Sequence, residues 1–108
     1  MALPIPFASG QLVVLALRDP KERVWGRLLG LEASGIAVRG VELTPWEEIL
    51  SLVKRGEADQ VALATRFVPM HRVESLYLDE PSSGVESLAE EFRRRAHAEP
   101  ADFLADLA

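Results

Sequence analysis

Hydrophobic periodicity switches twice along this chain, and the switches limit the folds open to it. Up to residue 42, apolar side chains alternate with polar ones in short runs divided by turn residues, which is typical of β-strands. Over residues 45–55 apolar residues recur at helical spacing, and alternation then returns over residues 60–79. The sequence therefore predicts a mainly β domain with one inserted helix.

Five strands are expected, at residues 11–17, 23–32, 36–42, 60–68 and 72–79. The first is apolar on both faces, which suits a strand that is covered on each side. The second contains Gly26 and Gly30, four positions apart and so on one face. Glycines inside a strand mark sharp curvature or close approach of another backbone. Together these features favour a small, strongly bent sheet.

Two sequence patterns predict where helices begin. Thr44-Pro45-Trp46-Glu47 has the form of a capping box with proline at the first helical position, and it opens the helix at about 45–55. Residues 87–90, Ser-Leu-Ala-Glu, form a second capping box that opens a C-terminal helical tail at about 87–107. Apolar side chains on the inserted helix and the tail exceed what a small barrel needs. They predict an oligomer or docking surface formed by Trp46, Leu88, Phe92, Phe103, Leu104 and Leu107.

Composition limits the function classes. The 108 residues fit one domain, with a barrel core at 11–79 and a helical extension at 80–108. The absence of cysteine excludes a disulfide scaffold, a thiolate metal site and a cysteine nucleophile.

A formal net charge of -5, concentrated after residue 79, argues against binding nucleic acid. No apolar run approaches the roughly 20 residues of a membrane span, so we expect a cytoplasmic protein that does not contact a membrane.

Two stretches resemble the motifs of Sm-like proteins. The first runs Val24-x-Gly-x-Leu-x-Gly-x-Glu-x-x-Gly35-Ile-x-Val38, a bent strand that leads into a hairpin. The second, Phe67-Val-Pro-Met-His-Arg-Val-Glu74, also resembles uncharacterised bacterial proteins whose final strand reads Phe-x-Pro-x-His-Arg-Val-Glu. The resemblance covers residues 11–79. It implies a five-stranded SH3/Sm-like barrel and ring assembly by pairing of edge strands.

The same resemblance implies RNA contacts near two loops. The first loop of the family carries an Asp and an Asn, whereas this chain has Ala33-Ser34-Gly35, so only Ser34 can hydrogen-bond a base there. The second loop corresponds to residues 69–72, where His71 and Arg72 can stack on a base or pair with phosphate. The candidate RNA or anion contacts are Ser34, Arg39, Arg66, His71 and Arg72.

Other chemistries find little support. The chain contains no Gly-x-Ser-x-Gly elbow, phosphate-binding loop or dinucleotide fingerprint, and its two histidines lie in different elements. We therefore expect neither catalysis nor a metal or other cofactor. Arg23-x-x-x-Arg27 followed by Ser34-Gly35-Ile36 is superficially similar to the PilZ domain, which binds cyclic di-GMP, but the gap between the two parts is too short.

The sequence thus favours a non-enzymatic interaction or assembly module that self-associates into a homo-oligomer and can hold a protein partner. An Sm-like RNA-binding protein is the alternative, and a domain that binds a cyclic dinucleotide is a further one.

Overall fold

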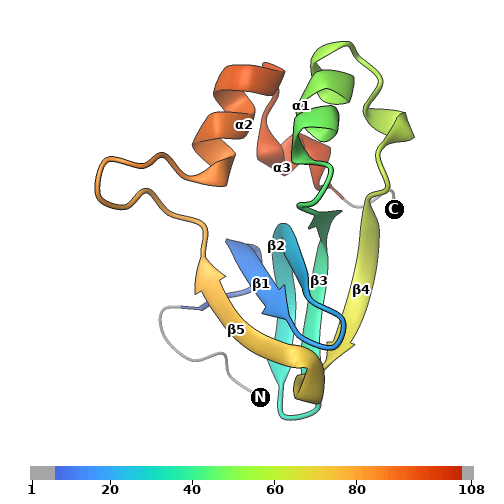
Figure 1. The fold of residues 1–108 in the computed structure, drawn as a ribbon, viewed down its shortest axis with the longest axis vertical. Coiled ribbons are helices and arrows are strands. Elements are labelled where there is room, and N and C mark those ends of the chain that lie inside the picture. The colour runs from blue at the N-terminus through green and yellow to red at the C-terminus, as the bar shows by residue number, and fades with distance from the viewer. Residues whose placement is uncertain (1–6, 106–108) are drawn as a thin grey trace.

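The structure is a computed structural model that describes residues 7–105 (Figure 1). Five antiparallel strands form one sheet in the order β4-β3-β2-β1-β5, which confirms the mainly β prediction. The strands are β1 (Leu12–Leu17), β2 (Glu22–Glu32), β3 (Gly35–Glu42), β4 (Ala64–Pro69) and β5 (Val73–Leu78). The inserted helix is α1 (Trp46–Lys54), and α2 (Leu88–Ala96) and α3 (Pro100–Phe103) follow the sheet. Short 3₁₀ turns are η1 (Ala58–Gln60) and η2 (Met70–Arg72).

The sheet curls strongly but stays open. The edge strands β4 and β5 are joined by η2, and within residues 7–105 they do not pair with each other. The expectation of a closed sheet over residues 11–79 is therefore wrong. The expected start of the fourth strand at residue 60 is also wrong, because residues 58–60 form η1 and pairing with β3 begins only at Ala64.

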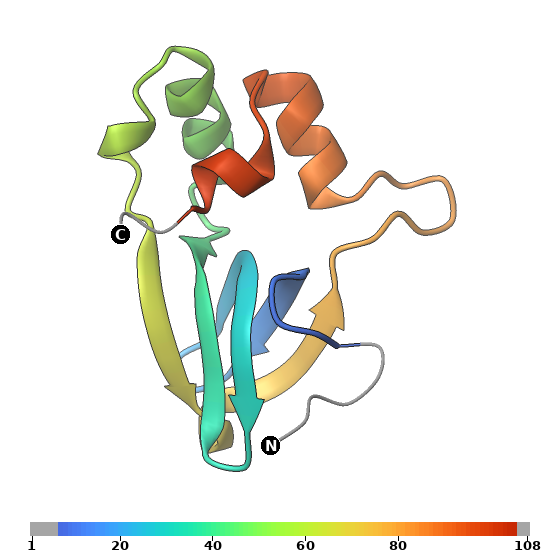
Figure 2. The ribbon, with the colours of Figure 1, turned by 180° about the vertical axis from the view of Figure 1, so that it is seen from behind.

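Two hydrophobic clusters lie on opposite faces of the sheet. Val13, Leu15 and Leu17 of β1 point into the curl, whereas Val14 points toward the helices, so β1 is covered on both faces as predicted. Inside the curl the buried members are Val13, Leu15, Leu17, Val24, Leu28, Ile36, Val38 and Val68. The helical layer (α1, α2 and α3) covers the other cluster, as Figures 1 and 2 show.

Gly26 pairs with Gly40 where β2 and β3 approach closely. A Cβ atom on Gly26 would lie 2.7 Å from the Cα of Gly40, so the close backbone approach predicted at this position is present. Gly30 is different, because a Cβ there would meet nothing within 4 Å. The register between β2 and β3 shifts between Leu28 and Gly30, as in a β-bulge. Because of this shift, the spacing of four residues does not place Gly26 and Gly30 in equivalent positions on the strand.

The two predicted capping boxes have opposite outcomes. Ser87 caps α2, with its hydroxyl accepting from the Glu90 amide and the Glu90 carboxylate accepting from the Ser87 amide. The prediction of a capping box at Thr44 is wrong, because no side chain caps the start of α1. Helix α1 begins one residue later than expected, Pro45 occupies its N-cap, and the Trp46 amide donates to the Leu43 carbonyl instead.

Candidate functional site

The two loops implicated in RNA contact lie at one end of the sheet. The Met70 amide donates to the Ser34 carbonyl over 2.9 Å, which holds η2 against the β2–β3 hairpin. His71, the residue after Met70, is exposed. The structure thus brings together Ser34 and His71 from positions far apart in the sequence.

The predicted arginines of this end have intramolecular partners. Arg72 donates to the Arg18 carbonyl at 3.2 Å and to the Pro20 carbonyl at 2.8 Å, so it fastens η2 to the β1–β2 turn. Glu22 accepts from Arg66 at 3.1 Å and from Arg72 at 3.3 Å. Burial raises the pKa of Glu22, but hydrogen bonds and charge from the two arginines outweigh it and hold the pKa below its ordinary value.

Arg39 lies away from these loops, on the helical side of the sheet. Only 8% of it is exposed, and its guanidinium donates to the Ala105 carbonyl and to the Thr65 hydroxyl, each at 3.1 Å. The first bond attaches Ala105, two residues after the end of α3, to β3. Arg39 therefore holds the C-terminal tail on the sheet, and the structure does not bring it to Ser34 and His71.

The side chains expected to form an oligomer or docking surface lie largely within the helical layer. Phe92 and Leu104 are fully buried, and the Trp25 ring lies 5.3 Å from Trp46 and 5.4 Å from Phe92 between ring centroids. Phe103 packs on Phe92 at 5.0 Å. Leu88 is half-buried in the same cluster, and Leu107 lies outside the described residues. The tail thus packs on the sheet of its own chain.

Charged and polar contacts reinforce this intramolecular packing. The Trp46 indole donates to Glu91 at 3.0 Å, and Arg95 pairs with both Glu91 and Glu47, which links α1 to α2. Hydrogen bonding to Arg95 lowers the pKa of the Glu47 carboxyl from its ordinary value. These contacts align the two helices side by side over the sheet.

Each edge strand carries an exposed aromatic side chain. Phe67 of β4 is 53% exposed and Tyr77 of β5 is 40% exposed. Their neighbours Val68 and Leu76 belong to the cluster inside the curl, so alternation turns both aromatic rings outward. Arg23 holds the Tyr77 hydroxyl through a hydrogen bond of 2.6 Å. Alternation in the sequence predicts which side chains of β4 and β5 share a face, but only the strand order of the folded sheet shows that both strands lie at its edges.

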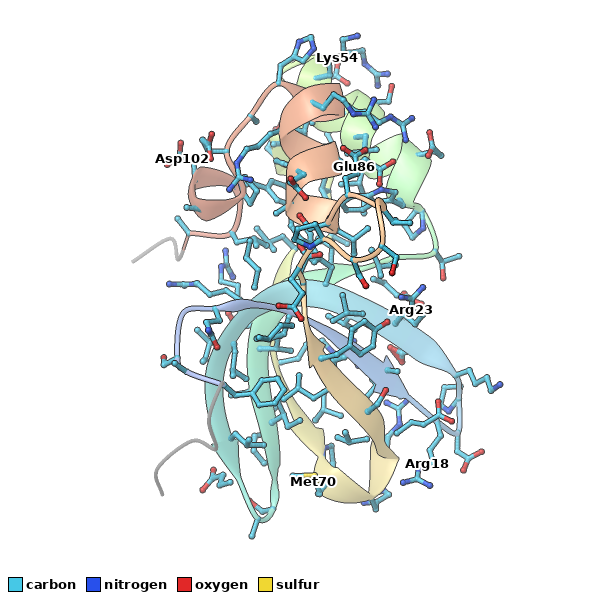
Figure 3. All side chains as sticks on the ribbon, turned by 90° about the vertical axis from the view of Figure 1, so that its left-hand side faces the viewer. Arg18, Arg23, Lys54, Met70, Glu86 and Asp102 are labelled. Atoms are coloured by element: carbon cyan, nitrogen blue, oxygen red, sulfur yellow. The ribbon has the colours of Figure 1, made fainter. Side chains whose placement is uncertain are left out.

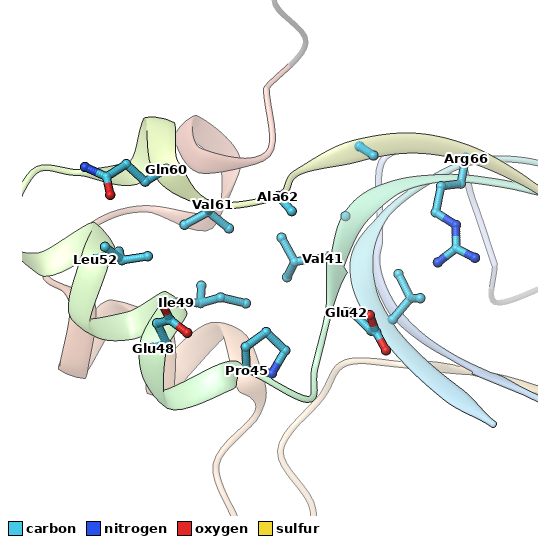
Figure 4. A pocket seen from close by; sticks show the side chains of 13 residues that line it. Val41, Glu42, Pro45, Glu48, Ile49, Leu52, Gln60, Val61, Ala62 and Arg66 are labelled. Carbon is cyan, nitrogen blue, oxygen red and sulfur yellow. The ribbon is translucent and has the colours of Figure 1, made fainter. Parts of the chain in front are cut away.

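A pocket of about 310 Å³ opens beside β4, between α1, η1 and the end of β3 (Figure 4). We call it the β4 pocket. Its apolar walls include Val41, Ile49, Leu52 and Val61, and Ala62 lies on the chain leading into β4. The remaining lining residues are Val24, Gly40, Glu42, Pro45, Glu48, Gln60, Ala64 and Arg66. Sequence reasoning missed this pocket, because helical and strand residues come together only in the folded chain.

The described residues hold neither a cluster of metal-ligating side chains nor a membrane-spanning helix. In the described part of the chain, no three histidine, aspartate or glutamate side chains gather as a metal site would require. Among residues 7–105, no helix is both long and apolar enough to cross a bilayer. No protein-family model, curated protein or solved structure matches the chain.

Proposed function

We propose that the protein is a non-enzymatic assembly module of the SH3/Sm-like small-barrel class that self-associates through its two open sheet edges. The observation that carries the proposal is the pair of edge strands, β4 and β5, each with an exposed aromatic residue. An edge strand presents unpaired backbone donors and acceptors, which a second strand can satisfy. Figure 1 shows the helices over one end of the sheet, with much of β4 and β5 extending beyond them.

The directions of the edge strands suit pairing between copies. In Figures 1 and 2, β4 and β5 lie on opposite sides of the molecule, and the chain descends along one and ascends along the other. A second copy placed beside the first therefore brings its β4 antiparallel to the first copy's β5. Phe67 and Tyr77 then lie on the same outer face of the junction, where cross-strand aromatic pairs stabilise a sheet.

Such a contact joins two different surfaces, so each copy keeps one free edge after pairing. Repeating the contact gives a ring if the rotation closes and an open filament if it does not. A non-enzymatic role agrees with the contacts that Arg39, Arg66 and Arg72 make within the chain.

The alternative function in RNA binding has weaker support. The exposed candidates brought together are Ser34 and His71, whereas Arg39, Arg66 and Arg72 are engaged in contacts within the chain. Binding to phosphates would give an affinity for oligo-U that falls steeply with added salt. No detectable oligo-U binding at low salt would eliminate this alternative.

Light scattering over a range of protein concentrations tests self-association. We expect Phe67→Lys to weaken it at least tenfold, because a charge on an edge strand opposes strand pairing and removes the aromatic contact. Ala101→Lys, at an exposed position of α3 and outside both edge strands, adds the same charge and should have no effect. A strict monomer at high micromolar concentration would refute the proposal.

A further inference from the structure

We infer that the turn at residues 82–85 of one copy inserts into the β4 pocket of the next copy, with Val85 as the buried side chain. This inference rests on the edge-to-edge association proposed above. It adds a specific contact that fixes the register and orientation of the two copies.

The turn is a well-formed hairpin, which we call the 82–85 hairpin. The amide of Ser82 donates to the Val85 carbonyl at 3.0 Å, and the amide of Val85 donates to the Ser82 carbonyl at 2.8 Å. Ser83 and Gly84 have φ angles of 50° and 78°, the positive values that two-residue hairpin turns adopt. Val85 is 68% exposed, more than Phe67 or Tyr77. The fold thus exposes an apolar side chain to water at the residue that closes an ordered turn.

Both ends of the 82–85 hairpin are fastened to the body of the molecule. Before it, the Asp79 carboxylate accepts from the amides of Leu88 and Ala89 at 2.7 and 2.8 Å. After it, Glu86 pairs with Arg94 of α2. Figure 3 views the side of the molecule from which this segment projects, with Glu86 labelled. Because the segment is already ordered, binding loses little conformational entropy.

The β4 pocket suits the tip of this hairpin. Its volume of about 310 Å³ exceeds that of a single valine side chain, so it can also receive part of the neighbouring backbone. Most of its walls are aliphatic, and Arg66, whose guanidinium bonds Glu22 at 3.1 Å, lies at one end of it. The aliphatic walls therefore suit a small apolar side chain such as Val85.

Strand pairing brings the hairpin and the pocket together. The 82–85 hairpin follows the C-terminal end of β5, and the β4 pocket adjoins the N-terminal end of β4. In an antiparallel pair these two ends meet. Figure 1 shows the loop after β5 projecting on one side of the molecule, between the sheet and the helical layer, and η1 and the start of β4 on the other side at a similar level. Antiparallel edge pairing therefore brings the hairpin of one copy to the same end of the junction as the pocket of the next.

Charge predicts how salt affects this junction. The pocket rim carries Glu42 and Glu48, and exposed Glu80 lies just before the hairpin, so like charges approach one another across the contact, whereas Glu86 after the hairpin is paired with Arg94. Burial of Val85 must overcome this repulsion, which salt screens over about 10 Å at 0.1 M. We expect self-association to strengthen as salt rises from low to moderate concentration, the reverse of phosphate binding.

Cysteine cross-linking tests the contact directly, because the natural chain contains no cysteine. One preparation carries Val85→Cys on the hairpin, and the other carries Ala62→Cys at the pocket. We expect a short bismaleimide to join the two preparations when they are mixed. Lys54→Cys, exposed at the far end of α1, serves as the control and should give no joined product with Val85→Cys.

A second variant measures the apolar contribution. Val85→Ser should weaken self-association by about tenfold, since burying a valine side chain contributes to binding by that order. Self-association of the natural chain without the cross-link between positions 85 and 62 would overturn this inference and leave the edge proposal standing. Absence of self-association in light scattering would overturn both.

Discussion

Asp79 is the residue whose replacement most directly tests how the sheet and the helices are joined. It follows β5, and its carboxylate accepts three hydrogen bonds: from the Trp25 indole at 2.9 Å, the Leu88 amide at 2.7 Å and the Ala89 amide at 2.8 Å. Two of these donors are amides of the first turn of α2, where a negative charge also interacts favourably with the helix dipole. One side chain therefore connects β2, β5 and α2.

The expected loss follows from these bonds. A hydrogen bond to a charged group contributes about 1.5–3 kcal/mol, so three would sum to at least about 4.5 kcal/mol. Half-burial of Asp79 and non-additivity bring the total somewhat below that sum. We expect Asp79→Ala to lower the free energy of unfolding by about 3–4 kcal/mol. In a domain of this size the midpoint of thermal unfolding should fall by more than about 10 °C. Asp79→Asn keeps the shape but replaces one acceptor oxygen by a donor, so about 2 kcal/mol should be lost.

Urea unfolding followed by tryptophan fluorescence gives the measurement, because Trp25 and Trp46 both lie in the cluster beneath the helices. Glu80→Ala removes the exposed carboxylate next along the chain and should change stability by less than about 0.5 kcal/mol. If Asp79→Ala loses under about 1 kcal/mol, the carboxylate does not hold the helical layer on the sheet as argued.

Two further predictions concern stability. Gly26→Ala should lower the free energy of unfolding by about 2 kcal/mol or more, because the new Cβ would press on the backbone of β3. Gly30→Ala places its Cβ in open space and should be nearly neutral. Equal urea midpoints for the two variants would contradict this reasoning. Because Arg66 and Arg72 hold the pKa of folded Glu22 below 4.5, the stabilisation from this carboxylate is present at neutral pH and is lost as pH falls below that value. The urea midpoint of Glu22→Gln should therefore decline less between neutral and acidic pH than that of the natural chain.

Local patterns in the sequence account for the elements that formed where expected. Alternation of apolar residues located β1, β2, β3 and β5 to within a residue or two, and the Ser87–Glu90 pair located the start of α2. These features depend on neighbours within one turn or one strand, so a single sequence contains the required information. Thr44 does not cap α1, although its sequence pattern matches that of Ser87. The chain turns into the helix through Pro45 at the N-cap, and the Trp46 amide bonds the Leu43 carbonyl in place of a threonine hydroxyl.

The candidate site depended on contacts between distant residues. Arg66 and Arg72 have the chemistry of an anion site, but Glu22, some 50 positions away, occupies both in the fold. Nothing in the sequence around Asp79 indicates its role, because the two α2 amides that donate to its carboxylate belong to Leu88 and Ala89, about ten positions later.

The amino-acid sequence by itself determined that the chain forms a curved antiparallel sheet with added helices, because periodicity, turn residues and caps act over a few positions. Tertiary structure alone decided that the tail covers its own sheet, that β4 and β5 are left as edges, and that a pocket opens beside one while a valine is exposed beyond the other. The physical reason is that burial and pairing are properties of surfaces assembled from segments far apart in the chain, which no local pattern specifies.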